Sequence, residues 1–310
     1  MLDLQTFLDE NYSKDEHIIL ACSAGPDSMF LLYELLKTSY KDKIVACYFN
    51  HKLRSQADRE EEFLLDLWEK LGFKVEVASA DIKKIRDSLY PSISLEELAR
   101  EKRYMFFSVI CQEYDTKKLI TWHHLDDKIE TFLFNLARGS KLTGFINMKK
   151  NNWNVLRPLL DLEKSQIQKY LDENNLAYFV DETNFDNTIT RNHLRNEIIP
   201  AFYRVNDKFK TNIANTLNYF EELKDFIDEE VKAFLLEEKY FSLNEFNKKT
   251  KFLQKEIIRY IYFISNWNST IWLSEADIWE VLKFLNSKGN KTKKEIKDLK
   301  MFKDWDKIYY

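Results

Sequence analysis

The first residues whose types and spacing suggest chemistry form the segment Ser23-Ala-Gly-Pro-Asp-Ser28, directly after an apolar run at Ile18–Cys22. A strand, a glycine-containing turn and a helix in this order are typical of phosphate sites in α/β proteins. Backbone N–H groups at the helix start can donate to phosphate oxygens, as can the Ser23 and Ser28 hydroxyls, and Gly25 permits close approach. No lysine follows, which excludes a Walker A loop. We predict phosphate binding, with an ordinary turn as the alternative.

A second polar segment, Phe49-Asn-His-Lys-Leu-Arg54, follows the next apolar run. In a parallel sheet its residues would lie at the same carboxyl edge as the first segment. The Arg54 guanidinium can pair with phosphate, whereas an isolated histidine such as His51 is more often structural than catalytic. The position favours a nucleotide site lined by Asn50, His51 and Arg54.

A third segment, Trp122-His-His-Leu-Asp-Asp-Lys-Ile-Glu-Thr131, concentrates histidines and carboxylates. If it is helical, one face carries the side chains of His123, Asp126, Asp127 and Glu130. Close carboxylates repel one another unless a cation offsets their charge. The pattern therefore predicts a magnesium or acid/base site, and a solvated helix face is the alternative.

A fourth segment carries Arg191 and Arg195, which are four residues apart. On a helix this spacing points both guanidinium groups in one direction, which suits a phosphate or a carboxylate. Ion pairing to Asp181 or Asp186 is the alternative.

The elements that position these segments follow from the hydrophobic pattern. Short β-type runs alternate with amphipathic helical stretches in the first half, which predicts an α/β fold with a parallel, Rossmann-like sheet and helices on both faces. Predicted strands are Ile18–Cys22, Ile44–Tyr48, Lys74–Val77 and Lys118–Thr121, and a helix starting after Ser94 has a capping box with Glu97. From about Arg191 the pattern is helical. We predict a catalytic domain at residues 1–205 and a smaller all-helical domain at 206–310.

Composition excludes several classes of protein. The chain has 310 residues with only five glycines and four prolines, which disfavours collagen-like and many-turned all-β proteins. No apolar run reaches the length of a membrane span, and the acidic start is unlike a signal peptide. Three widely spaced cysteines are expected to be reduced core thiols. These features predict a cytoplasmic protein without a membrane partner.

The charge is unevenly distributed. The net charge of the chain is -4, yet residues 241–310 carry 14 Lys and Arg against 9 Asp and Glu. The positive side chains concentrate in Lys288, Lys291, Lys293, Lys294, Lys297 and Lys300. Contact with a phosphate backbone and a solvated helix face are equally compatible with this run. The aromatic residues of this region recur with helical spacing, which favours a core over a base-stacking surface.

The loop at 23–28 resembles the PP-loop of the N-type ATP pyrophosphatases, whose pattern is Ser-Gly-Gly-x-Asp-Ser. Ala24 stands at the first glycine of that pattern, where a positive φ would add roughly 1 kcal/mol of strain. Pro26 lacks an N–H, which is tolerable where that donor is not needed. The loop would place Asp27 beside phosphate, where it caps backbone donors or holds magnesium.

Further motifs narrow the resemblance to the tRNA(Ile)-lysidine synthetase family over about residues 18–202. They are Asn50-His51-x-Leu-Arg54, Glu97-Leu-Ala-Arg100-x-x-Arg103-Tyr104, His123-His-x-Asp-Asp-x-x-Glu-Thr131, Arg157-Pro-Leu-Leu160 and Arg191-Asn-x-x-Arg195. Each motif alone is weak, but their conjunction and order are specific. The resemblance implies a ligase that uses ATP and Mg²⁺ to adenylate the 2-carbonyl oxygen of the wobble cytidine in tRNA(Ile) with a CAU anticodon. The ε-amine of L-lysine then displaces AMP to form lysidine, which changes the specificity of the tRNA from Met to Ile.

The resemblance also implies roles for residues. ATP binding falls to Ser23, Ala24, Gly25, Pro26, Asp27, Ser28, Asn50, His51 and Arg54. Asp27 and Asp127 would hold the metal ion. Asp127, Glu130 and His123 are candidates for the base that deprotonates lysine, and Arg191 and Arg195 would orient the cytidine or its phosphates. The helical C-terminal domain would contact tRNA.

Two alternatives remain open from the sequence. One is another PP-loop enzyme that modifies tRNA or forms amides, although the paired cysteines typical of thiolases and an ammonia-supplying domain are not seen. The other is a protein that binds nucleotide or tRNA without catalysis. Release of pyrophosphate in the presence of tRNA separates these functions.

Overall fold

The computed structural model describes residues 3–53, 56–152, 154–179, 193–236, 238–265 and 273–310. The chain divides into two compact units, Met1–Leu217 and Asn218–Tyr310. The division falls inside a long helix, α11 (Phe209–Leu235). The boundary at residues 205–206 between a catalytic and a tRNA-contacting domain stays a prediction.

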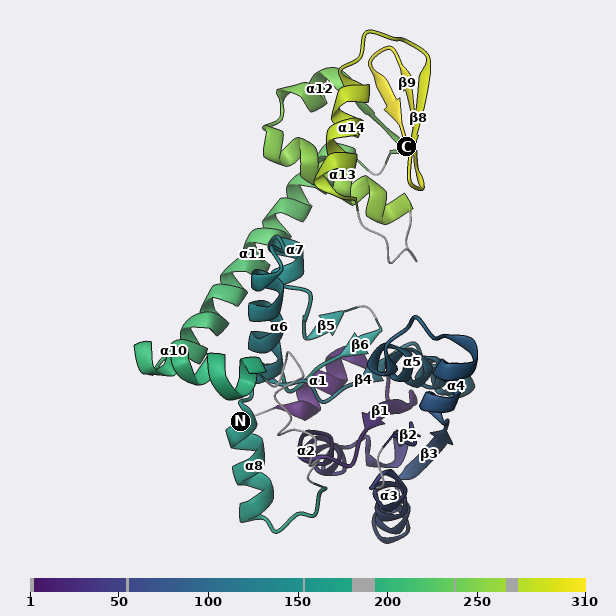
Figure 1. The fold of residues 1–310 in the computed structure, drawn as a ribbon, viewed down its shortest axis with the longest axis vertical. Coiled ribbons are helices and arrows are strands. Elements are labelled where there is room, and N and C mark those ends of the chain that lie inside the picture. The colour runs from purple at the N-terminus through teal and green to yellow at the C-terminus, as the bar shows by residue number, and fades with distance from the viewer. Residues whose placement is uncertain (1–2, 54–55, 153, 180–192, 237, 266–272) are drawn as a thin grey trace. The chain divides into compact units, whose positions relative to one another are not determined.

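Six strands of the first unit form one sheet in the order β3-β2-β1-β4-β6-β5 (Figure 1). The strands are β1 (Ile18–Cys22), β2 (Ile44–Asn50), β3 (Lys74–Ser79), β4 (Leu119–Ile120), β5 (Asn151–Asn152) and β6 (Val155–Leu156). Neighbouring strands pair in parallel, except that β5 and β6 are antiparallel. The predicted parallel sheet is therefore confirmed.

Helices cover both faces of this sheet. The helices of this unit are α1 (Leu4–Asn11), α2 (Pro26–Leu35), α3 (Ala57–Leu71), α4 (Ile82–Leu89), α5 (Leu95–Glu113), α6 (Leu125–Ala137), α7 (Leu142–Phe145), α8 (Lys164–Glu173) and α10 (Ile199–Val205), the last preceded by a π-helical turn at Leu194–Ile198. Alternate residues of β1 point to opposite faces. Ile18 and Leu20 pack in a core with α1, α2, α3 and α8, while Ile19 and Ala21 pack with α5.

The start of α5 shows how local sequence sets an element boundary. The Ser94 hydroxyl accepts a hydrogen bond from the Glu97 N–H at 3.1 Å, which caps the helix where the sequence predicted. None of the helices in the described part of the chain is long and apolar enough to cross a membrane.

The second unit contains a sheet that the sequence analysis missed. Its helices are α12 (Leu243–Lys248), α13 (Lys251–Ser265) and α14 (Glu275–Leu285), and its antiparallel sheet has the order β7-β10-β9-β8, from β7 (Tyr240–Ser242), β8 (Thr292–Ile296), β9 (Leu299–Asp304) and β10 (Lys307–Tyr309). The prediction of an all-helical second domain is wrong for these strands. Lysines at 293 and 300 belong to strands in which buried and exposed residues alternate with a period of two, so they do not form a helix face.

Candidate functional site

The site lies where the strand order of the first sheet changes direction. β1 pairs with β2 on one side and with β4 on the other, and both pairings are parallel. In such sheets the crevice beyond the carboxyl ends of the two central strands is open to a ligand. The segment after β1 and the segment after β4 therefore meet at one place.

The loop after β1 is held by its own hydrogen bonds. The Ser28 hydroxyl is completely buried; it donates to the Gly25 carbonyl oxygen at 3.0 Å and accepts from the Ser23 N–H at 3.2 Å. Ala24 has φ +57° and is also buried, so the position does require the left-handed conformation. Pro26 is the first residue of α2, where its missing N–H costs nothing. In this arrangement Ser28 maintains the turn.

Asp27 has one carboxylate oxygen without a partner. Its Oδ1 is buried and makes no hydrogen bond among the described residues. Its Oδ2 lies 3.6 Å from Nε2 of His124. A buried acceptor without a partner costs free energy, so it is an expected point of contact for a ligand.

His124, which the sequence analysis did not single out, occupies the centre of the site. It is the N-cap of α6, and its N–H donates to Oδ2 of Asp127 at 3.0 Å. Its Nε2 lies 3.4 Å from the same oxygen. Burial alone would lower the pKa of His124, but the nearby carboxylates of Asp27, Asp127 and Asp126 outweigh it and raise the pKa. A protonated His124 offsets the repulsion between Asp27 and Asp127.

The predicted helix contains Asp126, Asp127 and Glu130, but it does not include His123. The helix begins at Leu125, so His123 precedes it. Its Nδ1 is 2.9 Å from the Thr121 hydroxyl, and its ring stacks on that of Trp122. Burial, together with the charge of Arg157, lowers the pKa of His123 to about 4. His123 lies outside the helix because His124 is the N-cap residue, whose backbone is extended and not helical.

Glu130 and Arg195 form the second half of the site. Arg195 Nε lies 2.6 Å from Oε1 of Glu130, and Nη2 lies 2.9 Å from Oε2. The Glu130 side chain is 3% exposed, whereas that of Arg195 is 30% exposed. Arg191 lies outside the described residues, so the shared direction of the two arginines stays a prediction.

Asp126 turns away from this pair. Its carboxylate accepts from the Lys164 N–H at 2.8 Å, and the Lys210 ammonium lies 2.5 Å from Oδ1. These contacts lower the pKa of Asp126 although its burial acts in the opposite direction. Asp126 therefore joins α6 to the start of α8 and to α11.

Asn50 and His51, at the end of β2, are not among the described residues that line the pocket of the next paragraph. The Asn50 side chain is buried and donates to Asp58 at 2.8 Å and to Glu61 at 3.1 Å. Nδ1 of His51 accepts from the Leu53 N–H at 3.2 Å. Both side chains therefore make contacts within the β2–α3 region, and Arg54 lies outside the described residues.

A pocket of about 220 Å³ brings the remaining residues together. It is lined by Ser23, Gly25, Pro26, Asp27, Trp122, His124, Asp127, Lys164, Phe179 and Arg195. Trp122 and His124 lie inside a segment that the sequence had marked. No sequence motif marks Lys164 or Phe179, because only the fold brings them to the edge of the sheet.

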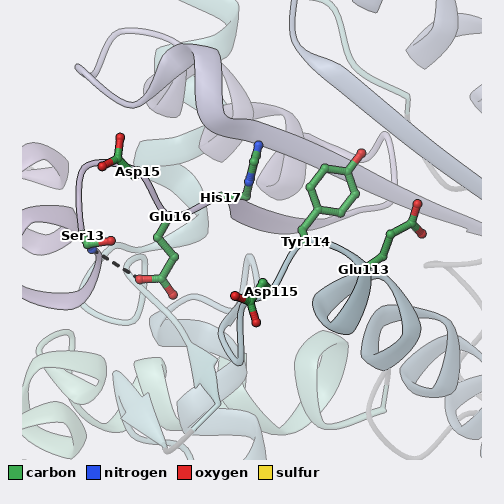
Figure 2. A pocket seen from close by; sticks show the side chains of 7 residues that line it. All are labelled: Ser13, Asp15, Glu16, His17, Glu113, Tyr114 and Asp115. Atoms are coloured by element: carbon green, nitrogen blue, oxygen red, sulfur yellow. Dashed lines mark hydrogen bonds between the residues drawn. The ribbon is translucent and has the colours of Figure 1, made fainter.

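A wider cavity of about 550 Å³ lies among the residues that precede β1 and follow α5. Figure 2 shows His17 and Tyr114 there, together with the carboxylates of Asp15, Glu16, Glu113 and Asp115. An anionic lining of this kind repels phosphate. A phosphate-bearing ligand is thus better accommodated at the 220 Å³ pocket.

The metal-binding capacity of the site is limited to a few carboxylate oxygens. Among the described residues no group of three or more His, Cys, Asp or Glu side chains is arranged to hold a metal ion. Magnesium is commonly held by one or two carboxylates together with substrate phosphates and water. Asp27 and Asp127, which line the same pocket, fit that mode of binding.

Comparison with known proteins agrees with this geometry. The model of the PP-loop domain family matches residues 2–202. A tRNA(Ile)-lysidine synthase of Mycoplasma mycoides is 31% identical over 306 residues, which is 96% of this chain and 74% of the relative. A tRNA(Ile)-lysidine synthase of Thermosipho africanus is 33% identical over 225 residues, 71% of this chain.

The chain spans about half the length of several of these relatives, including 52% of the Thermosipho africanus protein and 55% of the synthase of Thermotoga maritima. Among solved structures, a U34-tRNA thiolase from Methanococcus maripaludis superposes with a TM-score of 0.54. It is 16% identical, and the match covers 67% of this chain and 71% of the thiolase. This likeness concerns the fold alone.

Proposed function

Since the chain belongs to the tRNA(Ile)-lysidine synthase family and carries its PP-loop domain, we propose that it joins L-lysine to the wobble cytidine of tRNA(Ile) with a CAU anticodon. ATP would be converted to AMP and pyrophosphate as the cytidine is adenylated and then attacked by lysine. The observation that carries this proposal is the convergence of the loop at 23–28, Asp127 and Arg195 on one pocket. We place the reaction in the cytoplasm, where ATP and tRNA are both available.

The phosphates of ATP would lie at the start of α2. The Met29 N–H makes the first helical hydrogen bond, to the Gly25 carbonyl oxygen at 3.0 Å. The N–H groups of Asp27 and Ser28 precede it in the helix, at the positive end of the helix dipole. Together with the Ser23 hydroxyl, these donors would stabilise the negative charge that develops on pyrophosphate.

We assign magnesium to Asp27 and Asp127. The support is the buried Oδ1 of Asp27, which has no protein partner among the described residues. When bound, the ion supplies positive charge against the departing pyrophosphate. His124 would act as a positioning residue, because its Nε2 lies 3.6 Å from Asp27 Oδ2 and 3.4 Å from Asp127 Oδ2.

Of the three candidates for the base, Asp127 is best placed to deprotonate lysine. Its side chain is 23% exposed and lines the pocket. Glu130 is almost fully buried and bonded to Arg195, and His123 lies before the helix. Asp127 would therefore accept the proton of the lysine ammonium on the carboxylate oxygen that does not hold the ion, while Glu130 fixes the orientation of Arg195.

Binding of the cytidine would involve the open side of the pocket. Arg195 contributes a partly exposed guanidinium for the base or its phosphate, and Arg191 is proposed to act with it. Trp122 and Phe179 supply aromatic faces on which a flipped base can stack. A pocket of about 220 Å³ suits the reacting end of these substrates.

The test is incorporation of labelled lysine into a tRNA(Ile) transcript with a CAU anticodon, in the presence of ATP and magnesium. We expect label only with ATP, and none in a transcript with guanosine at the wobble position. Asp27→Asn should abolish incorporation, and Asp15→Asn, at the other cavity, should not.

Absence of label from the CAU transcript with wild-type protein would contradict the proposal. Pyrophosphate released in the presence of tRNA would then indicate another PP-loop reaction. ATP binding without pyrophosphate release would indicate a non-catalytic binding protein.

A further inference from the structure

The first turn of α11 places a lysine beside the start of two other helices. The Lys210 ammonium lies 2.5 Å from Oδ1 of Asp126, in the first turn of α6, and 3.3 Å from Oε2 of Glu163, the N-cap of α8. Its Nζ also lies 5.8 Å from the centre of the Tyr203 ring of α10. The Lys210 side chain is only 16% exposed. A single ammonium thus joins α11 to residues of α6, α8 and α10.

Asp126 connects this lysine to residues that line the pocket. Its Oδ2 accepts from the Lys164 N–H at 2.8 Å, and the neighbouring Leu125 N–H donates to the Leu162 carbonyl oxygen at 2.9 Å. Asp127 follows Asp126 directly in α6, and both Asp127 and Lys164 line the pocket. A displaced Asp126 carboxylate would therefore move pocket residues that belong to two different helices.

Each carboxylate that the sequence pattern singled out on α6 has a basic side chain as its partner. The pairs are Asp126 with Lys210, Asp127 with His124, and Glu130 with Arg195. Carboxylates on one helix face repel one another unless nearby cations offset their charge. His124 and Arg195 lie at the pocket and already have roles in the proposed reaction. Lys210 is the remaining partner, and it is not among the described residues that line that pocket.

The ring of His124 lies among three carboxylates. Its Nε2 lies 3.6 Å from Oδ2 of Asp27 and 3.4 Å from Oδ2 of Asp127. Its Nδ1 lies 3.7 Å from Oδ2 of Asp126, is buried, and makes no hydrogen bond within the described ranges of the chain. Without Lys210, the negative charge of Asp126 would attract the Nδ1 side of the ring more strongly and oppose the contacts on its Nε2 side. Lys210 therefore favours the observed orientation of the ring.

We propose that Lys210 is a positioning residue for the transfer of lysine to the cytidine. Its ammonium neutralises Asp126 and Glu163 and so holds the first turns of α6 and α8, which keeps Asp127 in place to accept the proton of the substrate. Lys210 acts through Asp126 and touches no substrate itself. The inference rests on the proposed function, because it concerns the step assigned to Asp127. The competing explanation is an ion pair that only stabilises the fold.

The experiment compares Lys210→Met with three further variants of the full chain. Lys210→Arg keeps the positive charge. Lys118→Met removes another lysine that pairs with a carboxylate, that of Glu16 at 3.0 Å, where Glu16 lines the other cavity. The double variant of Lys210→Met with Asp126→Asn also removes the carboxylate that has lost its partner. All variants are assayed at a temperature at which circular dichroism shows that each is folded.

We expect Lys210→Met to lower kcat for lysine incorporation about ten-fold or more and to leave the Kd for ATP within about two-fold. Lys118→Met should have the wild-type kcat, and Lys210→Arg should retain most of it. The double variant should recover part of the rate that Lys210→Met loses, because no unpaired carboxylate remains beside His124. An ion pair that only stabilises the fold would not give this recovery among proteins that are all folded.

A wild-type kcat in folded Lys210→Met would overturn the proposal. Equal losses in Lys210→Met and Lys118→Met would also overturn it, because the effect would then be one of general stability. The same holds if the double variant recovers none of the lost rate, since the charge of Asp126 would then not be the cause of the loss.

Hydrogen exchange supplies a readout that does not depend on activity. Backbone amides at the start of α6 and of α8 should exchange faster in Lys210→Met than in the wild type, and those of α2 should not. Unchanged exchange at the start of α6 would overturn the inference. Absence of lysine incorporation by the wild-type protein would contradict the proposed function, and the exchange at the start of α6 would then decide this inference separately.

Discussion

Arg195 bonds the carboxylate of Glu130 with two parallel hydrogen bonds, although the two residues are 65 positions apart in the chain. The pair is asymmetric, because Glu130 is almost fully buried and Arg195 is partly exposed at the pocket. Burial raises the pKa of Glu130 despite the opposing charge of Arg195. The carboxylate therefore orients the guanidinium from inside the protein and leaves its outer edge available to a substrate.

Removal of the arginine should destabilise the protein in a pH-dependent manner. Arg195→Ala leaves the Glu130 carboxylate buried without its partner, and we expect a loss of about 3 kcal/mol in the free energy of unfolding at pH 7.5. A raised pKa in the folded state favours folding at low pH and opposes it as pH rises. The loss should therefore shrink at pH 5, as measured by urea unfolding. Glu130→Gln in the same variant should recover part of the loss, and Arg204→Ala should change little.

The same substitution should separate binding from turnover. Because Arg195 is assigned to the cytidine, Arg195→Ala should reduce the rate of lysine incorporation by an order of magnitude or more and leave the Kd for ATP within about two-fold. Calorimetric titration measures the Kd for ATP, and single-turnover assays measure the rate of lysine incorporation. Equal losses in both would show that Arg195 belongs to the ATP site.

Because Ala24 has a left-handed conformation, we expect its replacement by glycine to have little effect on stability. Ala24→Gly relieves the strain of φ +57°, which offsets the lost buried methyl group and the added chain entropy. We expect the free energy of unfolding to stay within about 0.5 kcal/mol of wild type. Ala46→Gly, at an equally buried strand position, should lose about 1 kcal/mol or more. Similar losses for the two variants in chemical denaturation would be inconsistent with strain at Ala24.

The two adjacent histidines should give opposite pH dependences. His124 has a raised pKa, so its contribution to stability is complete below pH 6.5 and declines as pH rises through the folded-state pKa. His123, with a pKa of about 4, contributes above pH 6.5 and loses that contribution as pH falls towards 4. His124→Gln should flatten the alkaline side of the stability profile and His123→Gln the acid side. Urea unfolding between pH 4 and 9 measures the stability of both variants. The same pH dependence of stability in the two variants would contradict the opposite pKa shifts of the two histidines.

The ion pair between Asp126 and Lys210 should contribute to the free energy of unfolding. Lys210→Met is expected to cost about 2 kcal/mol at pH 7, because the ammonium bonds a largely buried carboxylate. The pKa of Asp126 is lowered, so this contribution is present above pH 3.8 and is lost as pH falls through the folded-state value. The difference in the free energy of unfolding between Lys210→Met and wild type should therefore become smaller at acidic pH. Lys208→Met, an exposed position two residues away, is the matched control, and equal effects would argue against the ion pair.

The sequence predicted those features that depend on neighbours along the chain. Strand β1 has the expected bounds, and the Ser94 cap lies where the motif placed it. The helix after β4 was expected, but its first residue was not, because either histidine could precede it. Because the helix begins at Leu125, His124 instead of His123 lies close to the carboxylates.

Features formed by residues distant in the chain were not predictable in this way. Nothing near Glu130 indicates that Arg195 will pair with it, and Phe179 reaches the pocket only because its N–H bonds the Ala24 carbonyl oxygen at 2.9 Å. The strands near the C-terminus were missed for a different reason. Lysines such as Lys293 and Lys300 gave the region the polarity of a helix surface, and the two-residue alternation was too short to outweigh it.

The strand order of the first sheet also bears on the sequence of events as the chain is made. Ile19 pairs with Val45, which follows it closely, but it also pairs with Leu119, which is synthesised only after α3, β3, α4 and α5. Closing the longer loop costs more entropy, so β1, β2 and β3 can assemble while β4 is still inside the ribosome. The nascent protein would therefore possess the loop at 23–28 well before His124, Asp127 and Arg195 arrive to complete its pocket. We therefore expect the capacity to bind nucleotide to appear late in synthesis, after Arg195 has left the ribosome.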